Sequence, residues 1–87
     1  MYVILVYDIG EERVTRALKI CRQYLTWVQN SVFEGETTEA KLGKLKLRLK
    51  QLIVHDQDSV LIYRLREQRY MEKEVLGLEK NTADTFL

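Results

Sequence analysis

The apolar positions are densest over residues 1–10, MYVILVYDIG, where nearly every residue before Asp8 is hydrophobic. Alternate residues of a strand point to opposite faces, so both faces of a strand here would be apolar as far as Asp8. This pattern is typical of a strand that is covered on both sides, rather than one with a face in water. The rest of the chain must therefore supply two covers for this strand.

Two later segments, residues 11–25 and 38–53, repeat apolar residues every three or four positions, which predicts amphipathic helices. Glu11 and Glu12 fall in the first turn of the earlier helix, where the helix dipole favours negative charge. Thr38 is the expected N-cap of the later helix. The apolar stripe of that helix consists of four leucines, Leu42, Leu45, Leu49 and Leu52.

Three further segments are predicted to be extended, because they are rich in β-branched and aromatic residues. Residues 26–36 form either one long strand or two short strands that meet near Asn30. Residues 58–66 form a strand whose middle is again apolar on both faces. Residues 71–78 are predicted to form a last short strand, and their poor alternation is expected of an edge or exchanged strand.

This order of elements predicts an α+β fold: a ferredoxin-like antiparallel sheet with two helices on one face. The chain offers no third helix for the other face, and an exposed apolar sheet face would be a larger patch than soluble monomers usually tolerate. A second copy related by a two-fold axis is the simplest cover. We therefore expect a homodimer through this other face. Residues 1–78 are expected to form one domain and 79–87 a C-terminal tail, of which Phe86 and Leu87 dock.

The composition leaves this picture unchanged, since 46% apolar and 31% charged residues are ordinary for a globular chain. A domain of 87 residues is marginal alone, which is a further reason to expect assembly. Because the apolar runs are shorter than a membrane span and no signal-peptide pattern appears, we expect a cytoplasmic protein with no membrane partner. The lone Cys21 is interpreted as a core residue and the lone His55 as a surface or helix-end residue.

The net charge of +1 does not by itself imply a polyanionic partner, but the charge is unevenly distributed. The second helix carries five basic residues and one acidic residue. Its basic face is either simply solvated or a surface that meets phosphates. The candidate nucleic-acid-binding residues are Arg13, Arg16, Lys41, Lys44, Arg48, Arg64 and Arg66.

Three segments together resemble the family of small CRISPR-associated adaptation proteins, also known as endoribonucleases. They are Val6-Tyr7-Asp8-Ile9, the run QNSVFEG at 29–35, and Ser59-Val60-Leu61-Ile62-Tyr63. The resemblance implies a ferredoxin-like fold, a homodimer, and partnership with the CRISPR integrase subunit that inserts new spacers. It also implies a metal-dependent endonuclease that acts on single-stranded RNA or duplex DNA. In such a protein Asp8 would be the metal ligand, and Tyr7 and Phe33 would belong with it to the catalytic residues.

The metal expected is Mg²⁺, or alternatively Mn²⁺. One carboxylate makes a poor Mg²⁺ site, but a dimer can place Asp8 and its symmetry mate on either side of one ion. Such an ion would activate water or stabilise the charge that develops on the phosphate. Taken as residues alone, Asp8 could instead cap the following helix, and Tyr7 and Phe33 could be core aromatics.

Two alternatives to an enzyme centred on Asp8 remain open from the sequence. The dimer could be a non-catalytic scaffold of the integrase complex that grips duplex DNA through its basic residues. It could also be a related ferredoxin-like toxin ribonuclease that acts outside any CRISPR array. Asp8 has no nearby histidine or cluster of acidic residues in the sequence. We therefore expect slow turnover if the protein is an enzyme.

Overall fold

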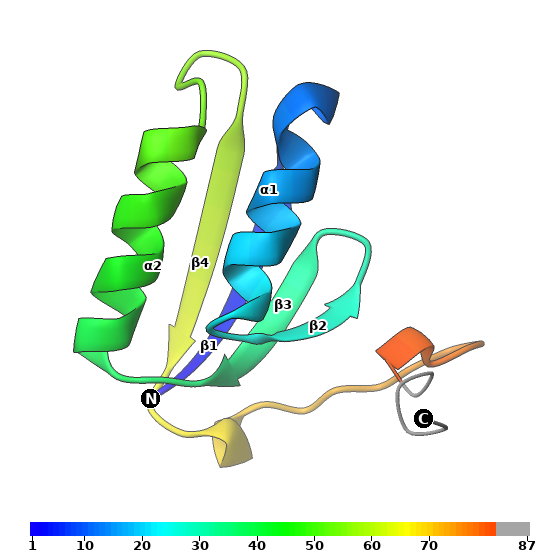
Figure 1. The fold of residues 1–87 in the computed structure, drawn as a ribbon. Helices are drawn as coiled ribbons and strands as arrows, with labels where there is room; N and C mark the ends of the chain where they lie inside the picture. Colours follow the sequence, from blue (N-terminus) through cyan, green and yellow to red (C-terminus); the bar gives the residue numbers. More distant parts are fainter. Residues whose placement is uncertain (82–87) are drawn as a thin grey trace.

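A computed structural model describes residues 1–81 and confirms the α+β, ferredoxin-like prediction (Figure 1). Four antiparallel strands form one sheet in the order β2-β3-β1-β4, with both helices on one of its faces. The prediction that Phe86 and Leu87 dock lies outside the described residues. The elements are β1 (Tyr2–Asp8), α1 (Glu11–Arg22), β2 (Thr26–Gln29), β3 (Val32–Glu36), α2 (Glu39–Leu52), β4 (Ser59–Leu65) and a 3₁₀ turn (Gln68–Tyr70).

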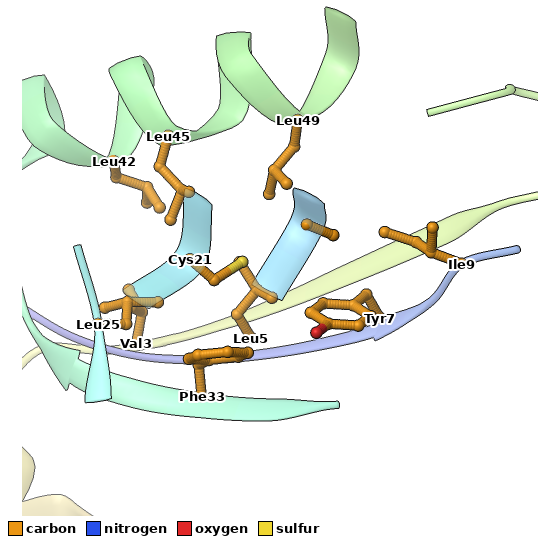
Figure 2. Packing of buried hydrophobic residues seen from close by; sticks show 11 residues of the cluster. Val3, Leu5, Tyr7, Ile9, Cys21, Leu25, Phe33, Leu42, Leu45 and Leu49 are labelled. Atoms are coloured by element: carbon orange, nitrogen blue, oxygen red, sulfur yellow. The ribbon is translucent and has the colours of Figure 1, made fainter. Parts of the chain in front are cut away.

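The core fills the space between the two helices and the sheet (Figure 2). Phe33 on β3 is fully buried, and its ring centroid lies 6.0 Å from that of Tyr7 on β1. Cys21 on α1 is also buried in this core, as predicted, and burial raises the pKa of its thiol to about 12. The opposing helix contributes three of the leucines predicted for its stripe, Leu42, Leu45 and Leu49.

Residues 26–36 form two strands, which settles the choice that the sequence left open. They make a hairpin whose turn contains Asn30 at φ 42°, a left-handed conformation that asparagine tolerates better than most residues. The indole Nε1 of Trp27 donates a hydrogen bond to the carbonyl oxygen of Asn30, 3.0 Å away. The bend at Asn30 is therefore fixed by a local side-chain contact.

The prediction of a strand over residues 71–78 is wrong for the single chain, because this segment is irregular there. It runs beneath the sheet toward β2 (Figure 1) and is tied there by an ion pair between Lys73 Nζ and Glu34 Oε2. A strand must pair its backbone groups with a neighbouring edge. Residues 72–78 make no backbone hydrogen bond to a strand edge within the described chain, so no ladder forms.

Helix α2 begins as predicted, with Thr38 Oγ1 accepting a hydrogen bond from the Lys41 backbone N–H. Gly43 is an exposed interior residue of this helix, and a Cβ added there would meet no atom within 4 Å. We expect Gly43→Ala to raise the free energy of unfolding by about 0.5–1 kcal/mol, because alanine loses less backbone entropy than glycine. For a domain of this size, each kcal/mol raises the Tm by roughly 4–8 °C.

Thermal unfolding followed by circular dichroism measures this change. Gly10→Ala is the matched control, because an added Cβ there would lie 2.5 Å from Arg13 Nη2. That variant should lower the Tm. A Gly43→Ala protein with an unchanged or lower Tm would contradict the prediction.

Candidate metal and nucleic-acid site

Asp8 is the last residue of β1 and is exposed to solvent. Within the described residues, its carboxylate makes no hydrogen bond or ion pair. The N-cap of α1 is Gly10, and no side chain caps that helix. The interpretation of Asp8 as a helix cap is therefore wrong, and its two oxygens are free to bind a ligand from outside the chain.

The sheet places Asp8 at one end of an apolar surface, the face turned away from the helices, which we call the outer face. The ladder of β1 with β4 sets Val6 opposite Leu61 and Ile4 opposite Tyr63, so these residues share one face with Asp8. Leu61 and Tyr63, on the edge strand β4, are 50% and 56% exposed, which is high for large apolar side chains. The two-sided apolar pattern of the first strand is thus present: on the outer face Tyr2 is buried and Ile4 and Val6 are half-buried, while the neighbouring Leu61 and Tyr63 of β4 are exposed.

One chain supplies one carboxylate to this site. Among residues 1–81, no three His, Cys, Asp or Glu side chains are grouped closely enough to hold a metal ion. Carboxylate oxygen is the donor that Mg²⁺ and Mn²⁺ prefer, so the chemistry of Asp8 fits either ion. The remaining ligands would have to come from a second copy, water or substrate phosphate.

Tyr7 and Phe33 lie in the core rather than at the surface that carries Asp8. Tyr7 is 5% exposed and Phe33 is 0% exposed. Burial is the main cause that raises the pKa of the Tyr7 hydroxyl, which disfavours a role as a base. We therefore assign neither ring a contact with substrate.

The predicted phosphate-binding residues do not form one cluster. Arg64 Nη1 bonds both carboxylate oxygens of Glu39 at 3.0 Å, and Arg48 Nη1 bonds Gln23 Oε1 at 2.7 Å. The register sets Leu65 opposite Tyr2 and Ser59 opposite Asp8, so Arg64 and Arg66 lie at the other end of the sheet from Asp8. Four of the predicted residues are exposed and make no ion pair within the described chain: Arg16, Lys41, Lys44 and Arg66.

Arg13 is engaged by Asp58, a residue that sequence reasoning missed. Arg13 Nε lies 2.7 Å from Asp58 Oδ2, and Nη2 lies 2.8 Å from Oδ1. The two side chains are only 11% and 1% exposed. An arginine held in this way has few donors left for a phosphate. Nothing in the sequence singled out Asp58, because two of its partners, Gly10 and Arg13, come from segments more than forty residues away.

Asp58 also makes the fold sensitive to acid. The Arg13 guanidinium, opposed in part by burial and helped by the backbone N–H groups of Val54 and Gly10, holds the pKa of Asp58 well below its usual range. A lowered folded-state pKa stabilises the fold above the ordinary aspartate pKa of about 3.9, and this stabilisation is lost as the pH falls toward the folded-state value. We expect the urea midpoint to drop on acidification below about pH 4.

Urea titrations at several pH values between 7 and 2 test this expectation. Asp58→Asn should have a lower midpoint at pH 7 and a shallower decline below pH 4 than the unaltered chain. Asp56→Asn, at an exposed position two residues away, is the control and should follow the unaltered chain. Parallel declines for the unaltered chain and the Asp58→Asn variant would contradict the assignment.

Among residues 1–81, none of the helices has the length and apolar character needed to cross a membrane. The model of the family described as "CRISPR associated protein Cas2" matches residues 1–73. A protein of Thermotoga maritima named CRISPR-associated endoribonuclease Cas2 is 52% identical over 87 residues, covering 100% of this chain and 99% of the relative. A relative with the same name in Dictyoglomus turgidum is 46% identical, with 100% of both chains covered.

Solved structures agree with this match. A structure titled "Crystal structure of cas2" superposes with a TM-score of 0.85 at 49% identity, over 92% of this chain and 90% of that one. Streptococcus pyogenes Cas2, at pH 6.5, gives a TM-score of 0.72 at 36% identity, over 86% of this chain and 100% of that one. Sequence and fold point to the same relatives along nearly the whole chain, and the chain therefore belongs to the Cas2 family of CRISPR-associated proteins.

Proposed function

We propose that this chain is a metal-dependent endoribonuclease of a CRISPR system, active as a two-fold dimer with the two Asp8 carboxylates at one Mg²⁺ or Mn²⁺ ion. The observation that carries the proposal is the free, exposed carboxylate of Asp8 at the end of an uncovered apolar sheet face. The relatives named as endoribonucleases support the reaction class.

The dimer is supported by the outer face. Leu61 and Tyr63 expose about half of their surface beside Ile4 and Val6. A two-fold axis through this face would bury the patch in both copies at once. It would also bring the two Asp8 ends toward each other when the axis runs along the strands near β1.

A second feature supports the same dimer. An apolar hollow of about 250 Å³ lies between α2 and the edge strand β4, with Leu49, Ile53, Val60 and Ile62 among its lining residues. Residues 71–78 carry apolar side chains that lie mostly in solvent, with Leu76 90% and Leu78 75% exposed. We propose that this segment of one copy pairs with the β4 edge of the other, so that the strand predicted there forms only in the dimer.

The proposed reaction requires only a few groups from this chain. Asp8 of each copy would hold the ion, which when bound supplies positive charge to the scissile phosphate. The exposed position of Asp8 at the strand end leaves it accessible to an extended nucleic-acid strand. Since no further cluster of acids or histidine is built within residues 1–81, water must act without a dedicated protein base, and turnover should be slow.

A scaffold that binds duplex DNA for the integrase subunit is the second candidate, and the free cations favour it. Arg16, Lys41 and Lys44 are exposed on the helices, away from the outer face. Contacts between basic side chains and the phosphate backbone hold nucleic acid without recognising its base sequence. A toxin ribonuclease outside any CRISPR array has less support, because the curated relatives are named CRISPR-associated.

One experiment separates the enzyme from the scaffold. Binding of duplex DNA and cleavage of single-stranded RNA are measured across a salt titration with the unaltered chain, Asp8→Asn, and a Lys41→Ala, Lys44→Ala double variant. If the chain is an enzyme, RNA cleavage requires divalent metal and Asp8. If it is a scaffold, DNA binding falls steeply with salt, loses part of that slope in the lysine variant and ignores Asp8. Absence of cleavage under all conditions would overturn the proposed enzyme.

A further inference from the structure

We propose that Asp58 is a positioning residue that fixes where Asp8 lies, acting through Gly10 and Arg13. The metal part of this inference rests on the proposed function. The geometric part stands on contacts within the described chain.

Asp58 is a buried carboxylate with every oxygen occupied. Oδ1 accepts hydrogen bonds from the Gly10 backbone N–H at 2.9 Å and from Arg13 Nη2 at 2.8 Å. Oδ2 accepts from Arg13 Nε at 2.7 Å and from the Val54 backbone N–H at 2.8 Å. One side chain thus joins the β1–α1 turn, the first turn of α1 and the loop before β4.

The joined segments surround Asp8. In the β1–β4 ladder Asp8 stands opposite Ser59, the residue after Asp58. Two residues beyond Asp8, Gly10 donates its N–H to Asp58, and the intervening Ile9 is buried in the core. Asp8 is therefore held on the β4 side by the ladder before it and by the Asp58 contact after it.

Support from the other neighbouring strand ends earlier. The ladder with β3 reaches only to Val6, opposite Val32, and is followed by one hydrogen bond from the Tyr7 N–H to the Ser31 carbonyl oxygen at 3.1 Å. An unsupported strand end is expected to fray. Because the end of β1 is paired on the β4 side alone, the contact between Asp58 and Gly10 adds a second fixed point on that side, two residues beyond Asp8, and keeps the end of β1 in one conformation.

A fixed conformation at the end of β1 affects both metal ligands of a two-fold symmetric site. Two Asp8 carboxylates must meet one ion, so any displacement of β1 in the chain appears in both copies. Groups that orient metal ligands typically change metal affinity about 10- to 100-fold when they are altered. Asn cannot replace Asp58 here, because its amide nitrogen would face two N–H donors at whichever oxygen position it took.

The test measures Mn²⁺ affinity of the full-length dimer by electron paramagnetic resonance of free Mn²⁺. Asp58→Asn should weaken binding about 10- to 100-fold while sedimentation still reports the dimer. Glu39→Gln is the matched control, because Glu39 also binds an arginine through both oxygens but lies at the opposite end of the sheet. It should leave the affinity unchanged. Equal affinities for Asp58→Asn and the unaltered chain would overturn the inference.

Asp8→Asn, measured beside these variants, separates the two proposals. If it leaves Mn²⁺ affinity intact, the proposed metal site is wrong, and the positioning role is then judged by amide hydrogen exchange alone. In Asp58→Asn, the amide of Gly10, which donates to Asp58 Oδ1, should exchange at least about tenfold faster, with the amides of Val3 and Leu5 unchanged. Unchanged exchange at Gly10 would overturn the positioning role.

If Asp58→Asn does not fold, Arg13→Lys takes its place. Lysine keeps the charge but cannot donate from two nitrogens to the two carboxylate oxygens. Weaker Mn²⁺ binding and faster exchange at Gly10 are again expected, and their absence would again overturn the inference.

Discussion

Asp8→Asn should abolish metal-dependent cleavage of single-stranded RNA, lowering the rate by at least about 100-fold, as when a group that stabilises transition-state charge is removed. The amide keeps the shape of the side chain but removes one negative charge from each copy. Because the Asp8 carboxylate is exposed and makes no hydrogen bond or ion pair within residues 1–81, the fold and the dimer should persist. Initial rates with Mg²⁺ and Mn²⁺, with and without chelator, measure the effect.

Glu11→Gln is the matched control for this variant. Glu11 is an exposed carboxylate three residues further along, in the first turn of α1. The Glu11→Gln variant should cleave RNA at the normal rate. This result would show that the loss of activity depends on the carboxylate at position 8 and not on the overall negative charge. An Asp8→Asn protein that cleaves normally with Mg²⁺ would show that Asp8 is not the ligand.

Tyr63→Glu and Leu61→Glu should each separate the two copies. Either change places a carboxylate on the outer face, and the two-fold axis would bury it twice without a cationic partner. Burial of an unpaired charge costs several kcal/mol, so the dissociation constant should rise at least about 100-fold, equivalent to roughly 2.7 kcal/mol. Sedimentation equilibrium over a range of concentrations measures it directly.

Leu47→Glu is the control for the outer-face variants. Leu47 is 58% exposed, close to the values for Leu61 and Tyr63, but it lies on α2. It should not change the association. If all three variants sediment like the unaltered chain, the outer face is not the contact between copies.

The fold was predictable because its signals are local. The two-sided apolar pattern of β1, the helical spacing of α1 and α2, and the Thr38 cap each depend on neighbouring residues, and each appears in the structure. The choice between one and two strands over 26–36 could not be made in advance. It depends on a left-handed Asn30 and on a bond to the Trp27 ring, neither of which has a unique sequence signal.

The candidate site was only partly predictable, because most of its contacts join distant segments. The place of Asp8 at a strand end follows from the pattern, but its free state does not, since a capping role was equally compatible with the sequence. The engagement of Arg13 by Asp58 does not, since the two residues are 45 positions apart. The same holds for residues 71–78, whose irregular conformation in the single chain was not indicated by their own alternation.

The uncovered outer face has a consequence for how activity depends on the amount of protein. If each ion is held by two chains, the active species is bimolecular in the chain. Below the dissociation constant, the cleavage rate would then grow with the square of the chain concentration, and above it the growth would become linear. A cell that makes little of this protein would hold almost no nuclease, so expression level alone could switch the activity on.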